Sequence, residues 1–240
     1  MTFAAPLAWE LIVTESSRPA ESIKQQAETL DIDLIVMSSR HRPYAAALLG
    51  STAEAVARTA PCPVLVTRFE GGRHQAGAIG NFEFKKMLIA SDFSSDSELA
   101  LRYGLSLAQE YRSELHLLHV LTDSKPGDED IAWTSDGAEG PYHDAARQLH
   151  QSVPAEAHLW CEVKHAVREG RAYREIVSYA VEEEINLICI GAHGQGYKLG
   201  HLFGSNADRV LRESPCPVLV VRPLKPEPPA PFGPNNEGKR

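Results

Sequence analysis

The chain has 240 residues and a formal net charge of -8, and this length allows a substantial apolar core in one large domain or two small ones. The acidic balance argues against a sequence-independent hold on nucleic acid or anionic lipid, because both require a basic face. No apolar run approaches the roughly 20 residues that span a bilayer, and the start lacks a secretory signal pattern. We therefore expect a soluble, cytoplasmic protein without membrane or nucleic-acid partners.

The first seventy residues read as the carboxyl half of a repeated strand and helix pattern. Strand-like segments are expected at residues 9–14 and 32–37, followed by Gly50, a helix and a third strand. The end of this pattern, Ala60-Pro-Cys-Pro-Val-Leu-Val-Thr-Arg68, returns as Ser214-Pro-Cys-Pro-Val-Leu-Val-Val-Arg222. A match of this length indicates an internal duplication.

The second copy can be followed from its first strand. Ser95 and Glu98 have the spacing of a capping box at the start of an amphipathic helix. The expected elements are strands at 84–90, 114–121, 158–167, 187–190 and 217–222, and helices at 95–111, 142–152, 172–184 and 205–213. Strands that alternate with helices of these lengths predict an α/β fold, a doubly wound five-stranded parallel sheet with helices on both faces.

These patterns divide the chain into an incomplete domain at 1–70, a linker at 71–81, a complete domain at 82–224 and a disordered tail at 225–240, rich in proline and glycine. The first copy lacks its first two strands and their helices. In a sheet of order 2-1-3 or 3-2-1-4-5 those strands lie inside the sheet. Because unpaired buried backbone is costly, we expect a truncated start, another chain or a rearranged pairing to account for the gap.

A glycine-rich segment from Gly191 to Ser205 follows the fourth strand of the second copy and comes immediately before a helix. Glycines let the backbone approach a ligand closely or adopt positive φ. The helix start offers unpaired N–H groups and the positive end of the helix dipole. The carboxyl end of a strand beside the switch point is also where open α/β sheets bind ligands. The segment therefore predicts an anion site, although it fits neither the P-loop nor the Rossmann fingerprint.

The spacing G-x2-G-x9-G-[ST], the following helix and Pro-Cys-Pro-Val-Leu-Val-Val-Arg resemble the ATP-binding branch of the universal stress protein family. Ile89-Ala-Ser-Asp-Phe-Ser94 and Leu117-Leu-His-Val120 also resemble that family. The resemblance implies an adenine nucleotide α-hydrolase-like fold, with a partial copy of it at the N-terminus. It also implies dimers, commonly through the last strand, so we expect a homodimer or pairing of the two copies within the chain.

Carried over by position, the resemblance implies that ATP, with or without magnesium, is bound by Ala90, Ser91, Asp92, Val120, Gly191, His193, Gly194, Gly204, Ser205 and Asn206. The three glycines would contact ribose and phosphates through their backbone, and Ser205 would donate its hydroxyl to a phosphate while capping the helix. Asp92 would contact the ribose or adenine side, and the backbone of Val120 the adenine edge. Asn206 stands where the family often has valine.

Each of these residues also has a structural interpretation. Asp92 could cap the following helix, and isolated glycines are more often turn residues. His193 has no assigned catalytic or metal role, and neither have His116 and His119, which face opposite sides of one strand. The four cysteines fall singly and are expected to be reduced core residues.

Three functions remain open at this point. The first is a regulatory, ATP-binding stress-response protein that needs no chemistry. The second is a slow ATPase, for which Lys198 is the nearest cation of the loop and no general base is evident. The third is a nucleotide-free scaffold. In the first copy Ser38 and His41 replace the first two glycines and only Gly50 and Ser51 remain, so we expect that copy to bind no nucleotide alone.

Overall fold

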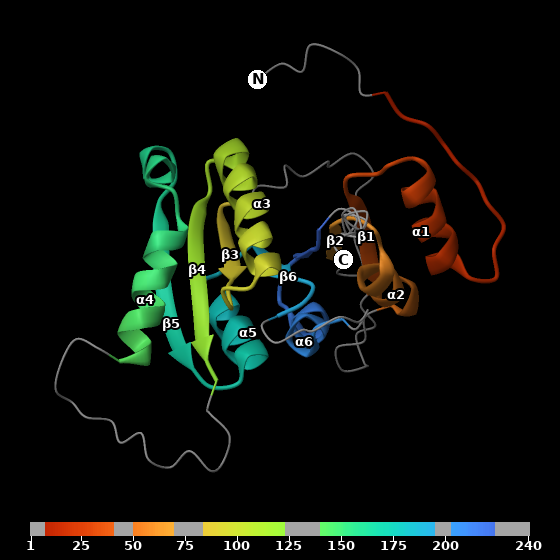
Figure 1. The fold of residues 1–240 in the computed structure, drawn as a ribbon. Helices are drawn as coiled ribbons and strands as arrows, with labels where there is room; N and C mark the ends of the chain where they lie inside the picture. The colour runs from red at the N-terminus through yellow and green to blue at the C-terminus, as the bar shows by residue number, and fades with distance from the viewer. Residues whose placement is uncertain (1–7, 41–49, 70–83, 123–139, 195–202, 224–240) are drawn as a thin grey trace, which may run out of the picture.

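The structure is a computed structural model that describes residues 8–40, 50–69, 84–122, 140–194 and 203–223 (Figure 1). The helices are α1 (Pro19–Thr29), α2 (Ser51–Thr59), α3 (Ser95–Tyr111), α4 (Pro141–Ser152), the 3-10 helix η1 (Ala155–Leu159), α5 (Ala172–Glu182) and α6 (Ser205–Glu213). The strands are β1 (Ile35–Arg40), β2 (Val64–Phe69), β3 (Lys86–Ala90), β4 (Glu114–Leu121), β5 (Val163–Glu169), β6 (Leu187–Gly191) and β7 (Val218–Val221).

The strands form one sheet of order β1-β2-β7-β6-β3-β4-β5. The five strands of the second copy are all parallel and follow the 3-2-1-4-5 order, which confirms the doubly wound fold expected from the sequence. The structure extends that sheet to seven strands, because β1 and β2 of the first copy join it at the β7 edge.

Side chains that alternate along the buried strands fill two cores, one on each face of the sheet. Helices α3 and α4 cover one face, and their core contains Ile89 and Leu187. Helices α5 and α6 cover the other face together with α2, and that core contains Leu88 and Ile188. The four cysteines are buried and none forms a disulfide, as expected. Among the described residues no helix is long and apolar enough to cross a membrane.

The two copies pair inside the chain through their last strands. Strands β2 and β7 are antiparallel, and Leu65 lies opposite Leu219, its own counterpart in the repeat. Helices α2 and α6 face each other across this local two-fold axis, where Arg58 lies 2.7 Å from Asp208 and Arg212 lies 2.5 Å from Glu54. The expected pairing of the copies within the chain is therefore observed, and β2 occupies the edge of β7 through which the resemblance implied a homodimer.

Three local expectations were wrong. Residues 9–14 form no strand. In the second copy the equivalent strand pairs with the second strand of the repeat, which the first copy lacks in the given sequence, and a strand without a partner is not stable. The segment expected as a strand from 158 begins instead with η1, and β5 starts only at Val163. Helix α3 is capped by Ser94, one residue earlier than expected, whose hydroxyl accepts a hydrogen bond from the Ser97 N–H.

The linker at 71–81 and the tail at 225–240 lie outside the described residues, as do His41 and Lys198. On the described part of the chain nothing pairs with the outer edge of β1, which is the position expected for the missing first strand of the first copy.

Candidate nucleotide site

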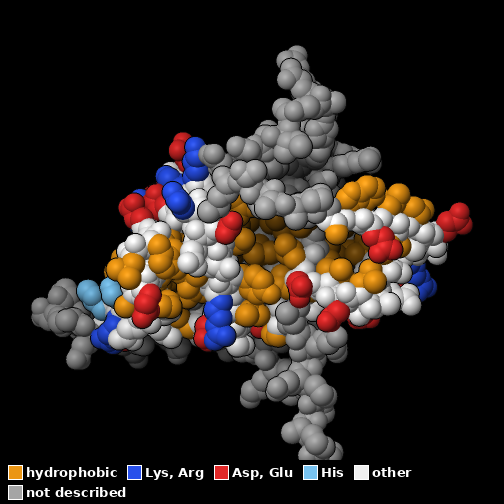
Figure 2. All heavy atoms as spheres, turned by 90° about the horizontal axis from the view of Figure 1, so that it is seen from above, with side chains coloured by type: hydrophobic (Ala, Val, Ile, Leu, Met, Phe, Trp, Pro, Cys, Tyr) orange, Lys and Arg blue, Asp and Glu red, His pale blue; other side chains and the backbone are white. Residues whose placement is uncertain are grey.

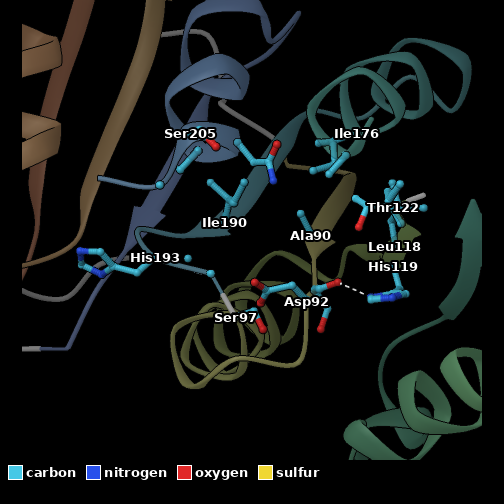
Figure 3. A pocket seen from close by; sticks show the side chains of 18 of the residues that line it. Ala90, Asp92, Ser97, Leu118, His119, Thr122, Ile176, Ile190, His193 and Ser205 are labelled. Carbon is cyan, nitrogen blue, oxygen red and sulfur yellow. Dashed lines mark hydrogen bonds between the residues drawn. The ribbon is translucent and has the colours of Figure 1, made fainter. Parts of the chain in front are cut away.

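A cavity of about 630 Å³ opens at the carboxyl ends of β3, β4 and β6, beside the start of α6 (Figure 3). This is the place where chain crossovers of a doubly wound sheet diverge and leave room for a ligand. All ten residues of the expected site line this cavity: Ala90, Ser91, Asp92, Val120, Gly191, His193, Gly194, Gly204, Ser205 and Asn206. The structure thus brings together segments that lie up to 116 positions apart in the chain, between Ala90 and Asn206, and their role in binding stays a prediction.

The start of α6 supplies hydrogen-bond donors to one end of the cavity. The first backbone bond of the helix runs from the Asp208 N–H to the Gly204 carbonyl. The N–H groups of Ser205, Asn206 and Ala207 precede it and have no partner within the helix. All three residues line the cavity. Together with the helix dipole, these donors make this end suited to an anion.

Gly204, not Ser205, is the N-cap of α6, and no side chain caps the helix. The expectation that the Ser205 hydroxyl caps the helix was therefore wrong. Ser205 is the first residue inside the helix, one position after the N-cap from which a side-chain oxygen can accept from the second or third N–H of a helix. Gly50 caps α2 in the first copy with φ -61° and ψ 135°, nearly the same as the -60° and 136° of Gly204.

The glycines of the loop are needed for close approach and not for positive φ. Gly170 is the glycine with positive φ among the described residues, so that part of the expectation was wrong for Gly191, Gly194 and Gly204. A Cβ on Gly191 would lie 2.9 Å from backbone atoms of α3, and one on Gly194 would lie 2.6 Å from Asp92 Oδ2. A Cβ on Gly204 would lie 3.1 Å from the Ala192 carbonyl oxygen. The missing side chains therefore let strand, loop and helix lie close together.

Asp92 follows β3 and does not cap α3, because Ser94 is the N-cap of that helix. Its Oδ1 accepts hydrogen bonds from the Ser94 N–H at 3.1 Å and from the Ser94 hydroxyl at 2.5 Å. These bonds fix the turn into α3. Its other oxygen lies beside Gly194 on the wall of the cavity. The turn thus fixes a carboxylate on the cavity wall, where it can accept hydrogen bonds from hydroxyl or amino groups of a ligand.

Asp96 of α3 holds the beginning of the glycine-rich loop. This carboxylate is buried, and its Oδ2 accepts hydrogen bonds from the His193 N–H at 3.2 Å and from His193 Nδ1 at 2.8 Å. Asp96 was not expected at the site, because a carboxylate in the first turn of a helix is a common dipole partner. Its role is to position the loop.

Several other residues of the cavity were also missed. His119 was given no role, yet it lines the cavity, stacks on Phe93 with ring centroids 4.4 Å apart and bonds through Nδ1 to the Ser91 carbonyl. Ile176 of α5 and Thr122 after β4 line the side away from α6. The sequence signal of Ile176 is that of any buried helix position, so only the fold reveals that it faces a cavity.

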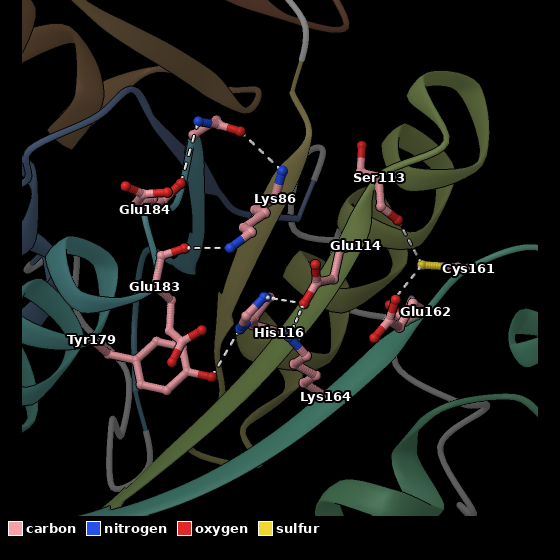
Figure 4. A network of polar contacts seen from close by, with 11 residues as sticks. Lys86, Ser113, Glu114, His116, Cys161, Glu162, Lys164, Tyr179, Glu183 and Glu184 are labelled. Atoms are coloured by element: carbon pink, nitrogen blue, oxygen red, sulfur yellow. Dashed lines mark hydrogen bonds and ion pairs between the residues drawn. The ribbon is translucent and has the colours of Figure 1, made fainter.

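A second polar cluster lies at the opposite end of the sheet, away from the cavity (Figure 4). His116 is fully buried; its Nδ1 lies 2.8 Å from the Tyr179 hydroxyl and its Nε2 3.0 Å from Glu114 Oε1. Burial lowers the pKa of His116, whereas a hydrogen bond from Lys164 lowers the pKa of Glu114. A neutral histidine bonded to a tyrosine is a structural arrangement, and we assign it no ligand.

The comparisons with known proteins agree with this fold. The model described as the universal stress protein family matches residues 10–68 and 83–222. The chain belongs to this family. Universal stress protein MJ0577 of Methanocaldococcus jannaschii is 29% identical over 154 residues, 58% of this chain and 95% of that protein.

Longer relatives match both copies. Universal stress protein Rv2005c of Mycobacterium tuberculosis is 26% identical over 202 residues, 80% of this chain and 62% of that protein. The crystal structure of a universal stress protein from Archaeoglobus fulgidus matches this chain with a TM-score of 0.63 and 25% sequence identity. The match covers 85% of this chain and 66% of the Archaeoglobus chain. The chain thus spans about two thirds of the length of these two longer universal stress proteins.

The first copy of the universal stress protein repeat shows what changes when a helix is missing. Ser38 stands where the second copy has Gly191, and it is exposed on β1. No counterpart of α3 covers it among the described residues, so nothing there requires a glycine.

In the described ranges no group of three or more His, Cys, Asp or Glu side chains is placed to hold a metal ion.

Proposed function

We propose that this universal stress protein binds ATP in the cavity of its second copy and acts as a nucleotide-dependent regulatory protein in a stress response. The observation that carries the proposal is the start of α6, whose first N–H groups have no partner within the helix and open into the same cavity as the carboxyl ends of β3 and β4. The volume of about 630 Å³ lies within the range of small-molecule sites.

The walls of the cavity suggest where the phosphates, the ribose and the adenine of the nucleotide would lie. The phosphates would take the N–H groups of Ser205 and Asn206, because these groups lie in the first turn of α6, have no partner within the helix and line the cavity. The ribose and adenine would lie toward Asp92, Val120 and His119, where a carboxylate and backbone groups accept and donate hydrogen bonds. Magnesium, where present, would bind as a complex with the phosphates of ATP.

Regulation by occupancy requires no chemistry, and this favours it over hydrolysis. No lysine or arginine is among the described residues that line the cavity, although phosphoryl transfer sites rely on such cations. Lys198, the cation that the loop could supply, lies outside the described residues. A slow ATPase and a nucleotide-free scaffold are the alternatives that the experiment must separate.

The test is a titration with ATP of the wild type and of Asn206→Asp. This isosteric change adds one negative charge at the start of α6, where it also favours the helix dipole, so the fold should not suffer. At about 5 Å and an effective dielectric constant of about 40, one unit of phosphate charge is repelled by about 1.7 kcal/mol. We therefore expect ATP to bind at least about tenfold more weakly.

Gln148→Glu is the matched control, because it makes the same isosteric change on the exposed side of α4. It should leave the affinity for ATP unchanged. Equal affinity in Asn206→Asp and the wild type would refute the placement of the phosphates. No binding to the wild type at millimolar ATP would favour the scaffold, and phosphate release that follows ATP occupancy would favour the ATPase.

A further inference from the structure

The two copies of the repeat meet in two kinds of contact. Apolar side chains of both copies share one core, and Figure 2, a view from the end of the sheet opposite to the cavity, shows hydrophobic side chains over both copies. Beside this core, α2 and α6 carry a ring of alternating charges formed by Glu54, Arg58, Asp208 and Arg212. The two arginines of the ring correspond to each other in the repeat, but they lie at different places with respect to the cavity.

Arg58 belongs to the last turn of α2, yet it contacts the wall of the cavity in the second copy. Its guanidinium carbon lies 5.6 Å from the centre of the Phe203 ring, and its Nη2 donates a hydrogen bond to Asp208 Oδ1 at 2.7 Å. Phe203 lines the cavity and comes directly before Gly204, the N-cap of α6, whereas Asp208 lies in the first turn of that helix. One side chain of the first copy therefore contacts two residues that flank the first N–H groups of α6.

The backbone of the same turn of α2 is connected to the beginning of the glycine-rich segment. The two ends of that segment are tied together, because the Gly204 N–H donates to the Ala192 carbonyl at 2.8 Å. The Ala192 N–H donates in turn to the carbonyl of Val221 at 2.7 Å. The next residue, Arg222, donates from its guanidinium to two backbone carbonyls at the end of α2. The end of α2 thus supports the segment both where it begins and where it ends.

We propose that Arg58 of the first copy is a positioning residue of the nucleotide site in the second copy. This inference rests on the proposed binding of ATP in the cavity. Arg58 does not touch the nucleotide but acts through Phe203 and Asp208, which it holds in place before the ligand arrives. A planar guanidinium suits both contacts, because its face stacks on an aromatic ring while its edge donates hydrogen bonds. A wall that is ordered beforehand need not be ordered during binding, and the affinity is higher for that reason.

A role limited to joining the two copies would give both arginines of the ring the same importance. Arg212 pairs with the same two carboxylates, at 2.5 Å from Glu54 and 3.3 Å from Asp208. Its side chain is 30% exposed, against 37% for Arg58. Arg212 lies in the last turn of α6, however, at the opposite end of that helix from Phe203. It is therefore the internal control that separates positioning of the site from joining of the copies.

The first test is a titration of the intact protein with ATP, for the wild type, Arg58→Met, Arg58→Lys and Arg212→Met. Methionine keeps most of the apolar stem of arginine and removes the charged group. An exposed cation–π contact and a partly exposed ion pair together change an equilibrium constant about three- to tenfold, so Arg58→Met should bind ATP more weakly by that factor. Arg58→Lys keeps the charge without the planar group and should lie between Arg58→Met and the wild type.

The control variant Arg212→Met should keep an affinity for ATP within about twofold of the wild type, because it removes a partly exposed ion pair at the far end of α6. Thermal unfolding should give the two methionine variants the same Tm within about 2 °C, since each loses one arginine of the same ring. A loss of affinity in Arg58→Met at equal Tm then reports on the site and not on the fold.

The second test needs no nucleotide. Hydrogen exchange at the Gly204 amide reports how often the bond to the Ala192 carbonyl opens. In the protein without ATP, this exchange should be about three- to tenfold faster in Arg58→Met than in the wild type. In Arg212→Met it should be unchanged.

The outcomes separate this inference from the proposed function. If the wild type binds ATP, equal affinity in Arg58→Met and the wild type would overturn the inference alone. Equal losses in Arg58→Met and Arg212→Met, or unchanged exchange at Gly204 in Arg58→Met, would also overturn it. Failure of the wild type to bind ATP would refute the proposed function, and the inference with it.

Discussion

Gly191→Ala tests the claim that the glycine-rich loop is shaped by close approach. The new Cβ would lie 2.9 Å from three atoms of α3, the Asp96 carbonyl carbon, the Asp96 Cβ and the Ser97 nitrogen. Ordinary contacts of this kind are about 3.4 to 4 Å, and two of these three atoms belong to the backbone, so β6 and α3 must move apart. Overpacking of this kind costs about 1 to 3 kcal/mol. For a chain of this size that is roughly 2 to 12 °C in Tm.

Thermal unfolding of Gly191→Ala beside Ser38→Ala is the assay. Ser38 is the counterpart in the first copy, already carries a Cβ and lies exposed, so its replacement by alanine should leave Tm within about 1 °C of the wild type. The backbone at Gly191 has no positive φ, so strain of the main chain cannot produce the loss. A Tm of Gly191→Ala equal to that of the wild type would refute the reasoning from close approach.

Two further predictions concern the core and pH. Gly104→Ala in α3 should lower the free energy of unfolding, because the new Cβ would lie 2.2 Å from Ile89 Cδ1. The double variant with Ile89→Val lacks that Cδ1 atom and should recover part of the lost stability. Urea unfolding measures the stability of both variants. Burial lowers the pKa of His116 and His165 from 6.5, so the unfolded chain takes up protons first as pH falls. The free energy of unfolding should therefore decrease below about pH 6.5, by up to about 1.4 kcal/mol per pH unit for each group, and a flat profile from pH 7.5 to 5 would contradict this.

The order of the elements could be predicted from the sequence because each buried strand carries a continuous apolar run and each helix a periodic one. The duplicated Pro-Cys-Pro-Val-Leu-Val segment located the last strand of both copies, and α6 was expected with the bounds that the structure gives it, Ser205–Glu213. The place of the glycine-rich segment followed from the same pattern, since a glycine segment between a buried strand and a helix lies at the carboxyl edge of the sheet, whereas Asp92 and Val120 were expected there only through the family resemblance.

The rest depended on contacts that the local sequence does not contain. Ser94 and Ser95 are both acceptable N-caps, and the hydrogen bonds of Asp92 to Ser94 fix the turn one residue earlier. The pairing of β2 with β7 could only be expected as one of two possibilities, because the same apolar edge would serve a homodimer. His119 and Ile176 have the sequence signal of ordinary core residues until the fold places them at a cavity.

The first copy contributes to the candidate site although it supplies none of the ten residues. Helix α6, whose start faces the cavity, is held against α2 by ion pairs of Arg58 and Arg212. These side chains are about a third exposed, and pairs of that kind are worth less than about 1 kcal/mol each. The larger contribution comes from the shared core, in which Val64 of β2 packs with Val210 of α6 and Val218 of β7, each at most 1% exposed. Burial of one such side chain contributes about 1.5 to 3 kcal/mol, so the position of α6 depends mainly on apolar packing between the copies and should be insensitive to salt.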